Sequence, residues 1–77
     1  MSNLVKLDLK TIGGRIKILR ILDDPHQTQG EFGAKIGYSS NMISKIERGR
    51  SEPTATFLLR LSELTGKSID LILKGED

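Results

Sequence analysis

The spacing of apolar residues changes near residue 11, and the change divides the chain into two parts. Between residues 4 and 10, apolar and polar positions alternate, as they do in an extended segment. From Thr11 to Asp23 the apolar residues instead recur three to four positions apart, which is typical of one face of a helix, and Pro25 then stops the pattern. We therefore predict a short N-terminal arm over residues 1–10, followed by a first helix.

Four further helices are predicted, each opened by a Ser or Thr that can cap the free N–H groups of a first helical turn. These caps are Thr28, Ser39, Thr54 and Ser68. Glycines follow the apolar pattern of the first three at positions 37, 49 and 66, where a helix commonly ends. Because no strand pattern alternates with these helices, the sequence predicts a compact all-α domain of five short helices over residues 11–77.

Residues 28–48 place two short helices on either side of a tight turn. Gly33 lets the two helices approach closely, and Gly37 accepts the left-handed backbone that such a turn requires. This arrangement is the helix-turn-helix unit, whose second helix enters the major groove of DNA, about 12 Å wide. In the second helix, residues 40–48, Ile43 and Ile46 mark the side that faces the core, so the polar side is left for DNA.

The run TQGEFGAKIGYSSNMISKIERGRSEPT resembles the lambda-repressor-like (Xre/Cro-type) family of helix-turn-helix regulators. The resemblance extends over residues 12–73, and ISKIERG is its most specific part. It implies a five-helix DNA-binding domain and a sequence-specific transcriptional regulator, most simply a repressor that binds an inverted-repeat operator as a homodimer. Two features depart from the family: the first loop, DDPHQ, is longer, and the polar Gln27 precedes the Thr28 cap where an apolar residue is common.

Polar residues on the outer side of the second helix are the predicted base contacts: Ser40, Asn41, Ser44 and Lys45. An Asn side chain can pair with adenine, and a Lys can donate to the acceptors of guanine. Helix N-termini and nearby basic or hydroxyl side chains are the predicted phosphate contacts: Thr28, Gln29, Lys35, Arg48, Arg50, Ser51 and Thr54. The alternative is that Asn41 and the serines only cap helices and cover the surface.

Glu47 requires a different explanation, because a carboxylate at the end of a DNA-facing helix repels phosphate. The family resemblance implies that Glu47 pairs with Arg20 near the end of the first helix. A helical wheel places Arg20 on a side near the core, so the two are predicted to form a structural ion pair. Arg15 and Lys17, on the same helix, are predicted to be exposed.

Composition restricts the class of protein further. The chain of 77 residues has a net charge of +2, but residues 1–50 carry +4 and residues 51–77 carry −2, which indicates either a polyanion partner at one end or a solvated surface.

Cysteine is absent, and the single histidine, His26, has no partner residue at useful spacing. No apolar run approaches the roughly 18 residues of a membrane span. We predict a cytoplasmic protein that is no enzyme and has no cofactor or metal.

A second subunit or another protein is the remaining predicted partner. A single small module buries only about 600–1,000 Å² on DNA, which favours a dimer, and Leu59 and Leu71, predicted to be exposed, are candidate dimer contacts. The apolar residues of the arm leave three arrangements open: the arm frays, it pairs with the arm of a second subunit, or it packs on the bundle. These residues are Val5, Leu7 and Leu9. An antitoxin-like protein with a toxin-like partner, or a restriction-modification controller, shares this fold and stays open as an alternative.

Overall fold

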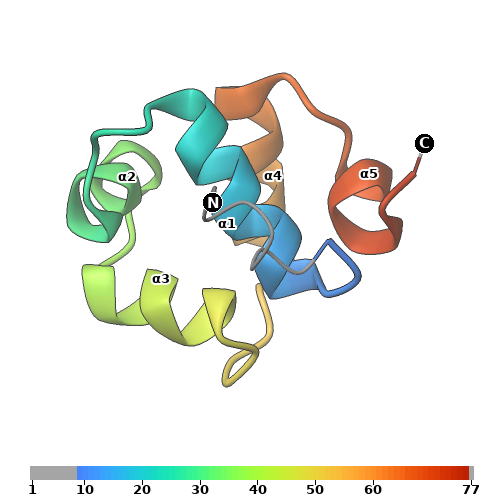
Figure 1. The fold of residues 1–77 in the computed structure, drawn as a ribbon, viewed down its shortest axis with the longest axis horizontal. Coiled ribbons are helices and arrows are strands. Elements are labelled where there is room, and N and C mark those ends of the chain that lie inside the picture. Colours follow the sequence, from blue (N-terminus) through green and yellow to red (C-terminus); the bar gives the residue numbers. More distant parts are fainter. Residues whose placement is uncertain (1–8, 77) are drawn as a thin grey trace, which may run out of the picture.

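The computed structural model describes residues 9–76, and this part of the chain consists of helices joined by short connections (Figure 1). The helices are α1 (Ile12–Asp23), α2 (Gln29–Ile36), α3 (Ser40–Glu47), α4 (Ala55–Thr65) and α5 (Ile69–Lys74). No strand occurs between residues 9 and 76, which confirms the predicted all-α class. Most of the predicted arm, with Val5 and Leu7, lies outside the described residues, while Leu9 and Lys10 form a turn.

Helix boundaries follow the four predicted caps and one further cap, Thr11, which the sequence analysis did not single out. The side chains of five residues each accept a hydrogen bond from the backbone N–H three positions later: Thr11, Thr28, Ser39, Thr54 and Ser68. At α2 the Glu31 carboxylate also accepts from the Thr28 N–H at 2.8 Å, which completes a capping box. One free N–H group at each helix start is therefore satisfied by a side chain that the neighbouring sequence supplies.

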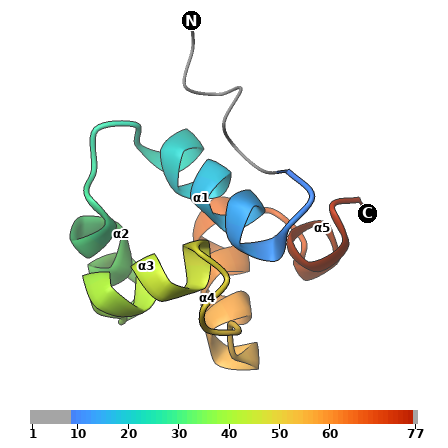
Figure 2. The same ribbon diagram turned by 60° about the horizontal axis from the view of Figure 1, so that its bottom comes forward.

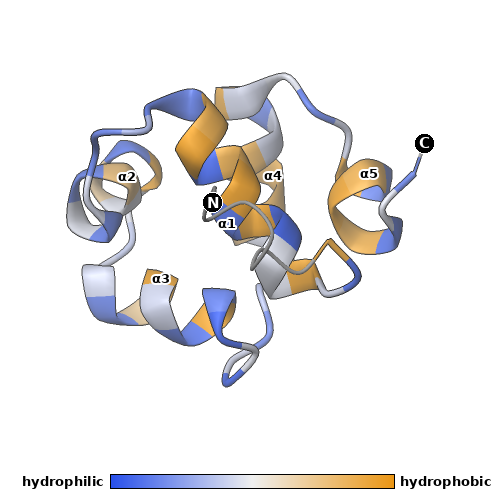
Figure 3. Cartoon of the chain, in the orientation of Figure 1, coloured by the Kyte–Doolittle hydropathy of each residue, from blue (hydrophilic) through white to orange (hydrophobic). Residues whose placement is uncertain are grey.

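One apolar side of each helix faces a common core (Figure 3). The core residues are Ile16, Leu19, Phe32, Ile36, Ile43, Ile46, Phe57, Leu58, Leu61 and Ile72. The ring of Tyr38 meets that of Phe57 edge to face, with 5.0 Å between centroids. Helix α1 packs against α3 and against α5, while α2 packs on α3 and α4. The two helices of the predicted DNA-binding unit are thus held on the same core as the rest of the domain.

Two glycines allow helices and turns to approach more closely than a side chain permits. A Cβ on Gly33 would overlap the carbonyl oxygen of Tyr38, which confirms the role predicted for this residue. A Cβ on Gly13 would lie 2.5 Å from the carbonyl oxygens of both Ile46 and Glu47. Gly13, which the sequence analysis did not single out, therefore sets the distance between α1 and the end of α3.

The predicted exposure of Arg15 holds only in part, because its guanidinium is bound to the end of α5. Its Nε and Nη2 donate to the carbonyls of Ile72 and Leu73, and its Nη1 donates to the carbonyl of Leu9, each at 2.8 Å. The guanidinium thereby satisfies carbonyl groups at the end of α5 that the helix leaves without partners. Arg15 ties α5 and residue 9 to α1, whereas Lys17 is exposed as predicted.

The two candidate dimer contacts differ in their surroundings. Leu59 on α4 is 52% exposed, as predicted. Leu71 is only partly exposed, because it lines a groove between α1 and α5 together with Leu9 and Leu22. The prediction of an exposed Leu71 therefore holds only in part. Within residues 9–76, no helix combines the length and the apolar content that crossing a bilayer requires.

Candidate nucleic-acid interface

Helices α2 and α3 form the predicted helix-turn-helix (Figure 2). Gly37 ends α2 in the left-handed conformation with φ of 83°, and the N–H of Tyr38 donates to the carbonyl of Gly33 at 2.8 Å. Three residues, 37–39, separate the two helices, and Ser39 caps the second. The turn is therefore fixed by hydrogen bonds at both of its ends.

Helix α3 has one apolar and one polar side. Ile43 is fully buried and Ile46 is 3% exposed, so these two residues anchor the helix in the core. Of the predicted base contacts, Ser40, Asn41 and Lys45 are exposed and Ser44 is partly exposed. The outer side of α3 consequently presents short polar groups and one ammonium to solvent, as the helical wheel predicts.

A buried cluster of three polar side chains holds α3 to both other helices of this region. Arg20 Nε lies 2.7 Å from Oε2 of Glu47, and Arg20 Nη2 donates to Oε1 at 3.0 Å. Gln29 Nε2 donates to the same Oε1 at 3.0 Å. The Glu47 side chain is 3% exposed and that of Arg20 is 13% exposed. The ion pair implied by the family resemblance is present, and it turns the carboxylate inward, away from any DNA on the polar side.

The side chains of two predicted phosphate contacts, Gln29 and Lys35, bind acidic residues of the protein. Gln29 gives one amide hydrogen to Glu47 and keeps the second for another acceptor. Lys35 Nζ lies 2.8 Å from Oδ2 of Asp23 at the junction of α1 and α2. The Lys35 ammonium therefore joins these two helices, and its predicted phosphate contact stays a prediction.

Gln27 explains how the longer first loop is held. Its side chain is buried, and Nε2 donates to the carbonyl of Arg20 at 3.2 Å and to Asp23 Oδ2 at 2.8 Å. It therefore adds a second hydrogen bond to a carbonyl that already accepts from the N–H of Asp24, which an apolar residue at this position could not do.

The Lys35 ammonium and the Gln27 amide lower the pKa of the Asp23 carboxyl below its ordinary value of 3.8. A lowered folded-state pKa stabilises the fold above the unfolded pKa and loses that contribution as pH falls through the folded value. Because the pair is partly exposed, we expect under about 1 kcal/mol. Urea unfolding of wild type and Asp23→Asn should show a stability difference at pH 6 that narrows below about pH 4. A difference that stays constant with pH would contradict this assignment.

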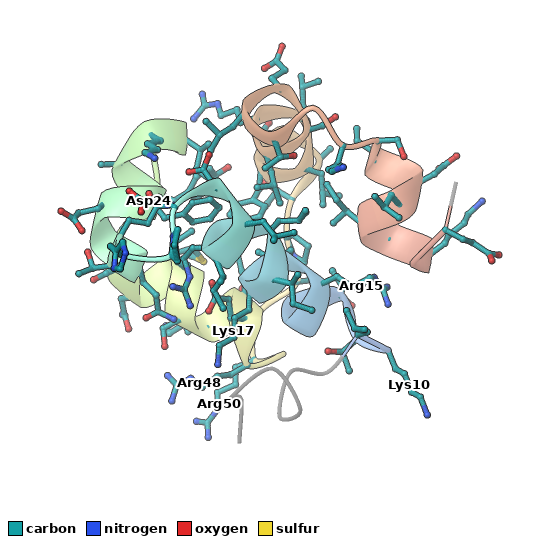
Figure 4. All side chains as sticks on the ribbon, turned by 45° about the horizontal axis from the view of Figure 1, so that its top comes forward. Lys10, Arg15, Lys17, Asp24, Arg48 and Arg50 are labelled. Atoms are coloured by element: carbon teal, nitrogen blue, oxygen red, sulfur yellow. The ribbon has the colours of Figure 1, made fainter. Side chains whose placement is uncertain are left out.

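The remaining predicted phosphate contacts surround α3. Thr28 lies exposed at the start of α2, and Arg48 and Arg50 project outward after α3 (Figure 4). Ser51 is partly buried, with its hydroxyl 3.8 Å from Met42 Sδ, and the Thr54 hydroxyl lies 3.3 Å from that of Tyr38. Hydroxyl and basic groups are therefore present on the connection after α3, and a further hydroxyl stands at the start of α2.

Comparison with known proteins identifies the family. The Helix-turn-helix family model matches residues 28–72, which is more than half of the chain. The chain belongs to the lambda-repressor-like helix-turn-helix family. This helix-turn-helix protein is 35% identical to the P22 c2 repressor in a crystal structure with synthetic operator 9T, with a TM-score of 0.76 over 86% of this chain and 97% of that one.

Two further comparisons agree with this placement of the helix-turn-helix protein. The nuclear magnetic resonance structure of the DNA-binding domain of the P22 c2 repressor matches with a TM-score of 0.72 and 34% identity, over 88% of this chain and 87% of that one. An uncharacterized HTH-type transcriptional regulator, y4dJ of Sinorhizobium fredii, is 29% identical over 72 residues, or 92% of each chain. The family is one of DNA-binding transcriptional regulators and is not a class of enzymes.

Proposed function

We propose that this protein is a repressor that binds a specific double-stranded DNA operator by inserting α3 into the major groove. The observation that carries the proposal is the division of α3 into a buried side, with Ile43 and Ile46, and an exposed polar side. A helix whose polar side is free of the core can reach base edges in the major groove. The similarity to the P22 c2 repressor, solved in complex with a synthetic operator, supports this proposal.

Asn41 and Lys45 are proposed to read bases. They are four residues apart on the exposed side of α3, so they face the same stretch of groove. The Asn41 carboxamide can both donate to and accept from adenine, and the Lys45 ammonium can donate to guanine. Ser40 and Ser44 are proposed to make adaptable contacts with neighbouring bases or with water.

Phosphate contacts are proposed at the start of α2 and on the connection that follows α3. At the start of α2, Thr28 and the second amide hydrogen of Gln29 stand beside backbone N–H groups and the positive end of the helix dipole. After α3, Arg48, Arg50, Ser51 and Thr54 provide two positive charges and two hydroxyls. Such contacts position the recognition helix and carry no sequence information themselves.

A homodimer on an inverted repeat is the proposed binding form. One α3 reads only a few base pairs, and a single module of this size buries about 600–1,000 Å² on DNA. Two subunits related by a twofold axis would place their recognition helices about 34–36 Å apart, in successive major grooves. The exposed Leu59 is a proposed contact between subunits.

Binding to DNA from upstream of the protein's own gene tests the proposal, with Asn41→Ala and Lys45→Ala compared with wild type. Each variant should lose about 1–3 kcal/mol of discrimination, a factor of about 5–150, between that DNA and a scrambled duplex. Lys74→Ala removes an exposed lysine from α5 and is the charge-matched control, expected to keep its selectivity. If wild type binds the upstream DNA no more strongly than the scrambled duplex, the proposal that it reads an operator in that fragment is contradicted. Co-purification would then test for a toxin-like protein partner.

A further inference from the structure

Lys17 is an exposed lysine on α1 that the proposed interface does not yet use. Its position follows from its neighbours on the helix. Four residues before it, Gly13 lies against the carbonyls of Ile46 and Glu47, and three residues after it, Arg20 binds the Glu47 carboxylate. Residues three and four apart lie on the same side of a helix. Lys17 therefore stands on the side of α1 that runs along the C-terminal end of α3.

Arg48 and Arg50 follow that end of α3 directly and are both exposed. Figure 4 shows the Lys17 side chain projecting toward the part of the surface where Arg48 and Arg50 also project, whereas Lys10 lies apart from them. Gly13 and Arg20, on either side of Lys17, both lie against the end of α3, so this part of α1 is close in space to the residues that follow α3. Side chains from α1 and from the connection after α3 therefore gather in one place.

This basic cluster, Lys17, Arg48 and Arg50, carries three positive charges that the protein does not neutralise. Within residues 9–76, none of the three side chains forms an ion pair, and their one side-chain hydrogen bond joins Arg48 Nε to the carbonyl of Ser44 at 3.4 Å. The nearest acid in the sequence, Glu47, is buried on Arg20. Glu52, two residues beyond Arg50, is exposed. Like charges held together at a surface repel one another, so the cluster is suited to an anionic partner.

We propose that the basic cluster binds the phosphate backbone of DNA beside the C-terminal end of α3, so that Lys17 extends the interface from the helix-turn-helix onto α1. The inference rests on the proposed DNA binding, and it adds a residue outside the helix-turn-helix to it. An ammonium on a flexible stem can contact phosphate without reading a base. Lys17 would therefore contribute to affinity for all duplex DNA and would leave sequence selectivity unchanged.

The dependence of binding on salt tests this role. Each phosphate contact releases condensed counterions, so the slope of log K against log salt should become smaller by about 0.9 in Lys17→Ala. Affinity for the operator and for a scrambled duplex should fall by the same factor. Lys17→Arg should restore the wild-type slope because it keeps the charge, and Lys74→Ala should keep that slope because α5 lies outside the cluster.

Failure of this inference and failure of the proposed function are distinguishable. If wild type binds no duplex DNA at any salt concentration, the proposed function itself fails. If wild type binds and Lys17→Ala has the wild-type slope, Lys17 contacts no phosphate and the inference fails, while the proposed function is unaffected. An equal loss of slope in Lys74→Ala would also overturn the inference, because the effect would then follow net charge. Thermal unfolding followed by circular dichroism checks that the exposed substitutions leave the fold intact.

Discussion

Replacing Glu47 with alanine is expected to lower the free energy of unfolding by about 3–5 kcal/mol, because the substitution leaves a buried charge without its partner. The Glu47 side chain is 3% exposed and accepts two hydrogen bonds from Arg20 and one from Gln29. Without the carboxylate, the Arg20 guanidinium, which is 13% exposed, keeps its charge and loses both acceptors. Urea unfolding of the variant and of wild type measures the difference.

A double substitution separates the charge effect from the packing effect. In Arg20→Met with Glu47→Leu, both charges are removed and apolar groups of similar length fill the space, so most of the stability lost in Glu47→Ala should return. If the double variant is as unstable as the single one, the loss reflects packing around α3 and the ion pair is not its cause. The double variant also shows whether Arg20 and Glu47 serve stability alone. Unchanged affinity for DNA in a refolded double variant would mean that the pair has no direct part in binding.

The elements of the fold were predictable because the rules that define them are local. A Ser or Thr at each helix start bonds to an N–H three residues later, and that spacing is visible in the chain. The positive φ of Gly37 likewise follows from a turn only three residues long. The exposed side of α3 follows from the burial of Ile43 and Ile46, because a regular helix fixes the relative directions of its side chains.

Contacts between distant residues were not predictable from spacing. Arg15 reaches the carbonyl of Ile72, 57 residues away, and a side chain that long is exposed or capped according to what packs beside it. The Arg20–Glu47 pair was anticipated only through the family resemblance. The sequence likewise does not show that Gln29 lies within reach of Glu47, or that Lys35 lies within reach of Asp23.

One signal in the sequence could have revealed the contact between α1 and α3. Glycine in a helix is unfavourable by about 1 kcal/mol relative to alanine, and the first turn of α1 nevertheless holds Gly13 and Gly14. Such a residue is expected where another segment approaches too closely for a Cβ. At Gly13 that segment is the C-terminal end of the recognition helix itself.

Gly13→Ala is therefore expected to destabilise the protein by about 3 kcal/mol, the upper end of the range for overpacking, even though alanine is the better helix former. The new Cβ would lie 2.5 Å from two carbonyl oxygens, and backbone atoms cannot escape by rotating a side chain. Gly30→Ala in α2 is the matched control. Its Cβ would meet the Ser40 Cβ at 3.5 Å, an ordinary contact, so this variant should be more stable by up to about 1 kcal/mol.

The stability changes expected for these two variants have opposite signs, and this difference tests whether the position of α3 is set by close contact with α1. Thermal and urea unfolding of Gly13→Ala and Gly30→Ala give the stability differences. Because the displaced segment in Gly13→Ala is the end of α3 that precedes Arg48 and Arg50, affinity for DNA should also fall under conditions where the variant is fully folded. A Gly13→Ala protein as stable as wild type would mean that α1 and α3 separate at little cost, and the recognition helix would then be positioned mainly by the Arg20–Glu47 pair.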